Sequence, residues 1–401
     1  MKHFSKTFWV VTVLVIVGSV SAYAAFSDNT NSSATTSATK LPTVTTEEIP
    51  PAPKPVVTHI ATPSSVKAVY TSAWVAGASK YMNRIVGMLD DTELNAVVID
   101  VKDSTGRISF TTNDPALTAL GASEKRIRDV SGLINSLHEK NIYVIGRISV
   151  FQDSFMTKKK PEWAIKKKSD GAVWKDRKGL SFMDPSNENV WKYTVALAKE
   201  AYAQGFDEIN FDYIRYPSDG NIKDINYNLK EGVTRADHLK AFFAYLHTEL
   251  KKDTPIPMSA DLFGLVTTEK NDMGIGQLLE DALPYFDFVA PMVYPSHFAT
   301  GFNNFKIPAQ KPYEVISVTM KSAVARSVAA GFTKDKIRPW LQDFSIKDNG
   351  HYVKYTPDMV RAQITATNDA GLSSWMLWDA SNKYTKEALL PEPKISETIK
   401  Q

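Results

Sequence analysis

Gly205-Phe-Asp-Glu-Ile-Asn-Phe-Asp-Tyr-Ile-Arg-Tyr-Pro217 is the stretch that decides the fold of this chain. From Glu208 onward, polar and apolar side chains alternate, which is typical of a β-strand whose two faces differ. The alternation predicts that Glu208, Asn210, Asp212 and Ile214 point to one side, into the interior of a barrel. A buried carboxylate is costly unless it is paired or hydrogen-bonded, so Asp212 has either a cationic partner or a function.

Seven more runs of β-branched or aromatic residues occur along the chain, so the sequence predicts eight strands. They span residues 66–72, 96–102, 143–150, 208–216, 256–263, 286–294, 337–344 and 372–379. Between most of them, apolar residues recur at helical spacing. Eight alternating repeats predict a parallel sheet closed into a (β/α)₈ TIM barrel, an α/β fold. An open doubly wound sheet is the alternative, and it ranks lower because no glycine-rich phosphate turn follows the first strand.

Helix boundaries support this interpretation. Thr234 and Asp237 have the spacing of a capping box, in front of an apolar stripe. Thr356 followed by Pro357 predicts the start of another helix, and Gly371 predicts its end. The stripe consists of Leu239, Phe242, Phe243, Leu246 and Leu250.

The amino-terminal segment has the features of an export signal. Basic residues at positions 2–6 precede an apolar run, and small residues at Ala22 and Ala24 match a cleavage site. The apolar run is also long enough to span a bilayer as a helix. Residues 1–26 are therefore expected to be a signal peptide or a membrane anchor. Both alternatives place the rest of the chain outside the cell, either secreted or on the extracellular face of the membrane.

The remaining chain divides into three parts by composition. Residues 27–65 are rich in Ser, Thr and Pro and predict a disordered linker, because they cannot bury enough apolar surface to fold. Residues 66–390 carry the strand and helix signals of the barrel domain. Residues 391–401 are expected to be a carboxy-terminal tail.

The composition excludes several functional classes. The chain has 401 residues, with 47 Lys and Arg against 44 Asp and Glu, and a formal charge of +3. Nucleic-acid-binding domains usually carry a strong basic excess, so we expect no nucleic-acid partner. The absence of cysteine removes disulfides, thiolate metal sites and cysteine nucleophiles. The seven histidines are scattered, and the sequence has no calcium-loop pattern. We therefore expect neither a metal nor a cofactor.

Three aspartates end predicted strands, where TIM barrels place their chemistry. They are Asp212, Asp261 and Asp343. Two carboxylates facing a sugar are what glycosidic cleavage requires: one protonates the leaving oxygen, and the other attacks the anomeric carbon or activates water. The alternative for Asp212 is a simple ion pair with Arg147 or Arg215, and Asp343 has the alternative of capping a loop.

Other candidate substrate-binding residues are polar or aromatic side chains near predicted strand ends. They are Asp100, Asp103, Arg147, Asn210, Tyr213, Arg215, Phe263, Tyr294, His297, Trp340, Gln342, Trp375 and Trp378. Aromatic rings pack against the apolar faces of sugars, and hydroxyls bind carboxylates and amides. Core packing is the alternative for the aromatic residues, and a structural hydrogen bond is the alternative for His297. A metal held by Asp100, Asp103 and Asp212 is a further, lower-ranked alternative.

Several motifs resemble those of a bacterial family of uncharacterised proteins known as putative glycosyl hydrolases. The resemblance covers nearly everything after the linker. It is carried by the stretch quoted above and by Ser259-Ala-Asp-Leu-Phe-Gly264, Ala290-Pro-Met-Val-Tyr-Pro-Ser-His297, Arg338-Pro-Trp-Leu-Gln-Asp343 and Trp375-Met-Leu-Trp378. The family is regarded as a distant TIM-barrel relative of the α-amylase-type glycosidases.

Matched strand by strand, the resemblance implies roles for the three aspartates. Asp212 would be the nucleophile, Asp261 the acid and Asp343 a stabiliser of positive charge. The chain departs from the amylase pattern in two ways. The acid of that pattern is Glu, whereas this chain has Asp261. That pattern has an arginine two residues before the nucleophile, whereas this chain has Asn210. Chitinase-type barrels are a weaker match, since Ile214 stands where their catalytic glutamate would be.

The loop from Gln152 to Asp184 is the largest insertion and is expected to overhang the site. Between residues 158 and 178 it has nine basic residues against three acidic ones. A solvated surface is one interpretation, and attraction of an acidic glycan is the other. We therefore expect an exported glycoside hydrolase that acts on a cell-surface or extracellular polysaccharide. A non-catalytic glycan-binding barrel and a metal-dependent polysaccharide hydrolase or deacetylase are the alternatives.

Overall fold

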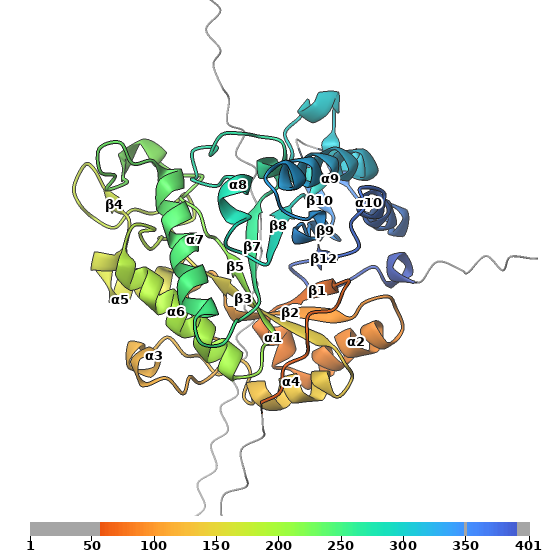
Figure 1. Ribbon diagram of the computed structural model, residues 1–401, viewed down its shortest axis with the longest axis horizontal. Coiled ribbons are helices and arrows are strands. Elements are labelled where there is room, and N and C mark those ends of the chain that lie inside the picture. Colours follow the sequence, from red (N-terminus) through yellow and green to blue (C-terminus); the bar gives the residue numbers. More distant parts are fainter. Residues whose placement is uncertain (1–56, 349–350, 391–401) are drawn as a thin grey trace, which may run out of the picture. The chain divides into compact units, whose positions relative to one another are not determined.

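The computed structural model describes residues 57–348 and 351–390, which form a closed barrel of eight parallel strands (Figure 1). Around the barrel the strands follow chain order, and the last strand pairs with the first. The strands are β1 (Lys67–Thr71), β2 (Ala96–Lys102), β3 (Tyr143–Ser149), β5 (Glu208–Asp212), β7 (Met258–Phe263), β8 (Phe288–Met292), β9 (Trp340–Gln342) and β12 (Trp375–Trp378). The predicted TIM barrel is confirmed, and the open sheet is excluded.

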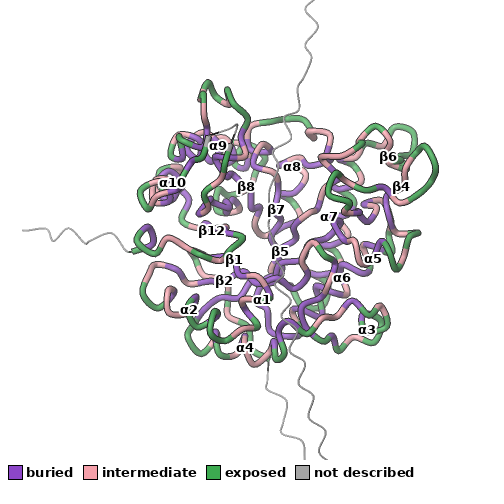
Figure 2. The backbone as a smooth tube through the Cα atoms, turned by 180° about the vertical axis from the view of Figure 1, so that it is seen from behind, coloured by how far each residue is buried: buried purple, intermediate pink, exposed green. Residues whose placement is uncertain are grey.

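Helices connect successive strands and surround the barrel (Figure 1). They are α1 (Ala73–Ala76), α2 (Ser79–Asp90), α3 (Pro115–Leu120), α4 (Val130–His138), α5 (Ser154–Lys159), α6 (Glu188–Ala203), α7 (Arg235–Lys251), α8 (Leu279–Ala282), α9 (Pro312–Ala329) and α10 (Pro357–Asp369). After β12 the described chain has only the short 3₁₀ helix η8 (Lys386–Leu389). Figure 2 shows buried backbone in the centre and exposed backbone on the outer turns, as expected for a barrel inside a helical layer.

The predicted helix boundaries are confirmed at α7 and α10. The Thr234 side chain accepts from the backbone N–H of Asp237, and the Asp237 side chain accepts in return from the N–H of Thr234. Thr356 caps α10 in front of Pro357. Gly371 follows α10 with a φ of 83°, a left-handed conformation that glycine adopts without strain.

Strand β5 is shorter than the alternating pattern predicts. It ends at Asp212 because Tyr213 has a φ of 52°, which breaks the extended backbone. The prediction that Ile214 points into the barrel is therefore wrong: Ile214 packs in the outer apolar cluster, between the strands and the helices. Glu208, Asn210 and Asp212 do point inward, as their partners show below.

A buried ion pair lies in the barrel interior, near the amino-terminal ends of the strands. Arg338 donates to Glu208 at 2.9 Å, and the Tyr143 hydroxyl donates to the same carboxylate at 3.1 Å. Both charged side chains are completely buried. The two charges at this amino-terminal end of the barrel therefore compensate each other. Catalytic groups are expected at the opposite, carboxy-terminal end.

Residues 57–65, which the sequence assigns to the linker, belong to the barrel unit instead. They lie at the amino-terminal ends of the strands. The Ile60 N–H donates to Asp207, immediately before β5, at 2.7 Å, and Thr62 hydrogen-bonds Tyr143, the first residue of β3, at 2.9 Å. This short segment therefore closes the base of the barrel.

The Gln152–Asp184 insertion forms an ordered arm. It contains α5, the 3₁₀ helix η1 (Pro161–Trp163) and strand β4 (Lys166–Lys167). Strand β4 pairs with β6 (Ile225–Asn226), which lies in the loop after β5. A second small sheet, β10 (Ile346–Asp348) with β11 (His351–Val353), follows β9. The arm is thus attached to the loop that follows Asp212.

The predicted signal or anchor (residues 1–26), residues 27–56 of the linker and the tail (residues 391–401) lie outside the described residues. Within residues 57–348 and 351–390, no helix has the length and apolar character needed to cross a membrane.

Candidate active site

Asp212 ends β5, and Asp261 lies two residues before the end of the neighbouring strand β7, towards the carboxy-terminal rim of the barrel. The register pairs Asn210 with Ser259 and Phe211 with Ala260, so the next position on each strand is one of the two aspartates. Adjacent strands lie about 4.8 Å apart. Asp212 is 5% exposed and Asp261 is 2% exposed. The structure therefore places two buried carboxylates side by side, at the rim where TIM barrels carry their chemistry.

Arg147 on β3 holds Asp212. Its Nε and Nη2 both donate to Oδ2 of Asp212, at 3.1 and 2.6 Å, while the N–H of Tyr213 donates to Oδ1 at 2.5 Å. The donors are a cation and a backbone amide, and charge-assisted hydrogen bonds of this kind are the stronger ones in proteins. Of the two cationic partners predicted for Asp212, Arg147 is the one that binds it.

Asp261 has a different environment. Its Oδ1 accepts hydrogen bonds from Nδ2 of Asn210 at 2.8 Å and from Nε1 of Trp340 at 2.7 Å. Burial, and next the negative charge of Asp212, raises the pKa of Asp261 well above its usual value. In the described chain no group donates to Oδ2, so that oxygen is available to carry a proton. Asp261 is therefore suited to act as an acid beside Asp212, which is bound to Arg147.

Arg147 also binds a second carboxylate, Asp100 on β2. Its Nη1 donates to Asp100 at 2.6 Å, and the Tyr70 hydroxyl donates to the other oxygen of Asp100, also at 2.6 Å. Burial lowers the pKa of Arg147, but the charges of Asp212 and Asp100 outweigh burial and raise that pKa. Burial raises the pKa of Asp100. One permanently charged guanidinium thus orients two carboxylates.

Aromatic rings line the wall beside Arg147. Tyr70 and Trp378 stack with their centroids 4.0 Å apart, and Trp340 meets Trp378 edge-on at 5.6 Å. The guanidinium of Arg147 lies 5.1 Å from the Trp378 ring. Burial and the charges of Asp261 and Asp212 raise the pKa of Tyr294, so its hydroxyl stays neutral near both carboxylates. Tyr70, Trp340 and Tyr294 are buried, whereas Trp378 is half-buried and is therefore the ring of this group that a sugar face could contact.

Tyr213, Arg215 and Phe263 form a second group at this rim. The Arg215 guanidinium lies 5.1 Å from the Tyr213 ring and 4.7 Å from the Phe263 ring. Tyr213 directly follows Asp212, and Phe263 follows Asp261 by two residues. The group therefore borders the carboxylate pair on the side of β5 and β7.

His297 and Gln342 are engaged with the protein. Ser296 donates to Gln342 Oε1 from its N–H at 3.1 Å and from its hydroxyl at 2.9 Å. His297 packs edge-on against Tyr294 at 5.2 Å and Phe344 at 5.9 Å. Burial lowers the pKa of His297 to about 4, so this ring is neutral at physiological pH.

Asp343 lies apart from the other two catalytic candidates. Its carboxylate accepts from the N–H of Thr385 at 2.7 Å and from the Thr385 hydroxyl at 2.6 Å, which fixes the chain after β12. Burial raises the pKa of Asp343 to about 6, although the Thr385 bonds lower it. In the described chain no hydrogen bond joins Asp343 to Asp212 or Asp261.

Two further candidates do not join the carboxylate pair. Trp375 is fully buried in the outer cluster, between the strands and the helices. Asp103 pairs with Arg126 at 2.6 Å and accepts from Thr105, in the loop after β2.

The metal alternative requires Asp100, Asp103 and Asp212 to lie around one ion. Arg147 stands between Asp100 and Asp212. The residues that the structure describes contain no group of three His, Asp or Glu side chains placed to hold a metal.

Tyr70 is a residue of the candidate site that the sequence patterns did not identify. It stacks on Trp378 and donates to Asp100, so it belongs to the wall of the site. A signal was available, because the period of two along β1 places Ala68 and Tyr70 on the same face as the other interior residues.

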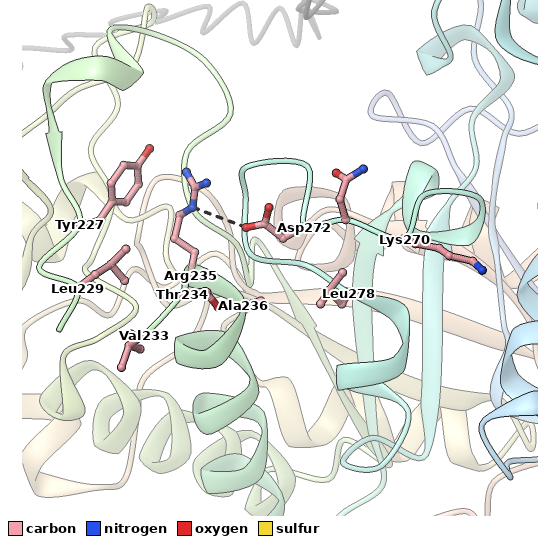
Figure 3. Close-up of a pocket in the computed structure, with 10 residues that line it drawn as sticks. Tyr227, Leu229, Val233, Thr234, Arg235, Ala236, Lys270, Asp272 and Leu278 are labelled. Atoms are coloured by element: carbon pink, nitrogen blue, oxygen red, sulfur yellow. Dashed lines mark ion pairs between the residues drawn. The ribbon is translucent and has the colours of Figure 1, made fainter. Parts of the chain in front are cut away.

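A separate pocket of about 610 Å³ lies on the loops that follow β5 and β7 (Figure 3). Arg235 and Asp272 face each other across it, with Nε 3.6 Å from Oδ2. Tyr227 lies under Arg235, at 4.9 Å from its guanidinium. None of the predicted site residues lines this pocket, so substitutions of its residues can serve as controls.

Comparisons with solved structures show glycoside hydrolase barrels. The glycoside hydrolase domain of PgaB (BpsB) from Bordetella bronchiseptica matches with 11% identity, a TM-score of 0.58, and coverage of 82% of this chain and 100% of that one. A chitobiase from Flavobacterium johnsoniae matches with 13% identity, a TM-score of 0.51, and coverage of 81% and 47%. At these identities both likenesses show the fold.

A hypothetical protein from Ruminiclostridium thermocellum ATCC 27405 is more similar in sequence. It is 35% identical, and the alignment covers 48% of this chain and 96% of that one, with a TM-score of 0.44. No curated protein matches the chain. Residues 68–384, most of the chain and nearly all of the barrel, match the family described as "Putative glycosyl hydrolase domain". This chain belongs to that glycosyl hydrolase family.

Proposed function

We propose that this protein hydrolyses glycosidic bonds in a polysaccharide, with Asp261 as the acid and Asp212 as the ionised carboxylate. The observation that carries the proposal is the contrast between two neighbouring aspartates. Arg147 and a backbone N–H bind Asp212, whereas burial, and next the charge of Asp212, raises the pKa of Asp261. A carboxyl group with a raised pKa beside a carboxylate that binds a cation is the arrangement that glycosidic cleavage needs.

In this proposal, the proton of Asp261 passes to the glycosidic oxygen as the bond to the anomeric carbon breaks. Asp212 either attacks that carbon or takes a proton from an attacking water. Asn210 and Trp340 orient Asp261 through hydrogen bonds to Oδ1, so the proton is directed from Oδ2. The ring of Trp378 is placed to pack against the apolar face of a sugar.

We also propose that the substrate is a cell-surface or extracellular polymer. The support is the amino-terminal sequence, with its basic start, apolar run and small residues. Fractionation of the producing cells, with sequencing of the mature amino terminus, tests this location. Recovery of the intact chain in the cytoplasm would contradict it.

The activity is tested by measuring new reducing ends when the full chain is incubated with purified cell-envelope polysaccharides. Asp212→Asn and Asp261→Asn are expected to lower the rate by a factor of about 100 or more, as loss of an acid or base does. Asp272→Asn is the matched control, since Asp272 lies in the loop after β7 and pairs with Arg235. A wild type that retains polysaccharides but cleaves no member of the panel would contradict the proposal and favour a glycan-binding barrel.

A further inference from the structure

Arg215 is a cation without a carboxylate partner at the rim of the candidate active site. One of its nitrogens, Nη1, donates to the carbonyl of Tyr216 at 3.1 Å and to the Ser218 hydroxyl at 3.3 Å. In residues 57–348 and 351–390, no carboxylate lies within 4.0 Å of its guanidinium. Its Nε and Nη2 find no acceptor in the same residues, and neither is sealed from solvent.

Three aromatic rings surround this guanidinium. The rings of Phe263, Tyr213 and Phe182 lie 4.7, 5.1 and 5.9 Å from it. Rings hold a cation in place without neutralising it, and they remove water from its faces. Burial accordingly lowers the pKa of Arg215, while the charges of Tyr213, Asp212, Asp219 and Asp176 raise it. The guanidinium remains charged because arginine stays protonated even so.

The unused donors have a particular geometry. Nε–H and one Nη2–H lie along the same edge of the planar guanidinium and point in parallel directions. This edge forms two parallel hydrogen bonds with a carboxylate or with two oxygens of an acid ester. A hydroxyl of a neutral sugar satisfies only one of them.

The basic arm lies against the same group. Phe182, one of the three rings, is near the end of the arm, and β4 of the arm pairs with β6 in the loop that carries Arg215. Between residues 158 and 178 the arm has nine basic and three acidic residues. A net positive surface beside the site attracts anionic polymers over a distance of about 10 Å at moderate salt.

We infer that Arg215 binds the acidic group of a substrate sugar next to the bond that is cleaved, so that the polymer is an acidic polysaccharide carrying carboxylates. Arg215 is placed for this contact because its neighbours Tyr213 and Phe263 follow the two catalytic candidates in sequence. This inference rests on the proposed function, since it assigns a substrate class to the same site. An ester oxyanion, such as a sulfate, would offer the same pair of oxygens, and the experiment separates the two.

The test measures binding rather than cleavage. The full chain with Asp261→Asn, which is expected to slow cleavage of the polymer, is run by affinity electrophoresis in gels containing alginate, polygalacturonate or hyaluronan. Each polymer is compared with its carboxyl-reduced form, and dextran sulfate is compared with dextran. We expect at least one acidic polymer to bind about tenfold more tightly than its carboxyl-reduced form, the size of effect that a charge-assisted hydrogen-bond pair supplies.

Adding Arg215→Met is expected to remove this preference, and adding Arg215→Lys is expected to keep part of it. Arg107→Met is the matched control, because the Arg107 guanidinium also lies over a ring, that of Phe155, at 4.4 Å, and donates only to the carbonyls of Gly121 and Ser123 in the described chain. Thermal unfolding of each variant shows whether it is folded. The preference in the parent is expected to persist at high salt, whereas attraction by the arm alone disappears there.

Three results would overturn the inference. They are an equal preference in the Arg215→Met variant, no preference for any acidic polymer in the parent chain, and a preference confined to dextran sulfate, which would assign the site to an ester instead of a carboxylate. Because these results concern binding, they are independent of hydrolysis. A parent that prefers acidic polymers while the wild type cleaves none would refute the proposed hydrolase and leave Arg215 as a carboxylate-binding residue.

Discussion

Arg147 donates two hydrogen bonds to one oxygen of Asp212, from Nε at 3.1 Å and from Nη2 at 2.6 Å, and a third to Asp100 at 2.6 Å. Three charged side chains that are nearly buried thus share one network at the rim. Such a network is stable only when it is complete, because each carboxylate without its cation is a buried, unpaired charge.

Arg147→Met is therefore expected to lower the free energy of unfolding by about 3–5 kcal/mol at neutral pH, the cost of breaking a buried pair. Urea denaturation followed by circular dichroism measures it. Arg338→Met breaks the Glu208 pair at the other end of the barrel and is expected to cost a similar amount. Only the Arg147 variant is expected to lose activity beyond its loss of folded protein, and equal specific activities in the two variants would contradict this.

Asp261 gives a stability effect that depends on pH. Its pKa in the folded chain lies above the unfolded value, so the folded state holds a proton that the unfolded state releases, and stability falls as pH rises through this interval. Asp261→Asn stays neutral and keeps the oxygen that accepts from Asn210 and Trp340. We expect it to raise the melting temperature at neutral pH and to leave it unchanged near pH 4. An equal effect at both pH values would show that the carboxyl is ionised in the folded protein.

The same variant has a kinetic signature. Removal of a general acid slows cleavage of poor leaving groups by a factor of about 100 or more. Glycosides with nitrophenolate leaving groups need no proton, so the Asp261→Asn variant is expected to retain much of its rate on them. Equal losses on both substrate types would contradict the assignment of Asp261 as the acid.

Trp375 and Trp378 are the first and last residues of β12, and they differ in what they contact. Trp378 stacks on Tyr70 beside Arg147, whereas Trp375 is buried in the outer cluster with an Nε1 that has no partner in the described chain. Trp378→Phe is expected to raise KM severalfold with little change in stability. Trp375→Phe is expected to lower stability by about 1–3 kcal/mol through the cavity it leaves, and to keep KM. Activity assays and urea denaturation of both variants test this, and the reverse pattern would exchange their roles.

Thr385 lets the role of Asp343 be measured without changing the aspartate. Its hydroxyl binds the ionised carboxylate, so Thr385→Val is expected to raise the pKa of Asp343 further above about 6. The lost stabilisation is present above that pKa and disappears as pH falls below it. We expect a loss of about 1–2 kcal/mol at neutral pH or above and a smaller loss near pH 4.

Thr248→Val is the control for this measurement, since among the described residues the Thr248 hydroxyl binds only a helix carbonyl, that of Ala244. Its effect on stability is expected to be independent of pH. If Asp343 anchors the loop after β12, the Thr385→Val variant keeps its kcat on any substrate that the wild type cleaves. A fall in kcat with unchanged stability would give Asp343 a part in catalysis.

The barrel could be predicted from the sequence because its strands and helices follow two simple periods. The inward positions of Glu208, Asn210 and Asp212 followed from the period of two. Ile214 was predicted wrongly because the left-handed conformation of Tyr213 ends the strand, and a tyrosine gives no local sign of it. The outward position of Trp375 could have been predicted, since residues three apart on a strand lie on opposite faces.

The contacts between strands were less predictable. The sequence offered Arg147 and Arg215 equally as partners of Asp212, because the choice depends on side-chain positions around a closed barrel. Likewise, the sequence predicts that Asp343 and Asp261 both end strands, and the hydrogen bonds of Asp343 to Thr385 show that its environment differs. Which side chains lie at the rim is encoded locally, whereas their partners are set by the packing of distant segments.

Residues 57–65 close the base of the barrel, while Asp212 and Asp261 lie at the opposite rim. The segment that holds Ile60 and Thr62 therefore lies on the face that is remote from the two aspartates. A label or a support attached at this segment would leave the rim with Asp212 and Asp261 facing the bulk solution. Polymers would then approach the two aspartates without passing the attachment point.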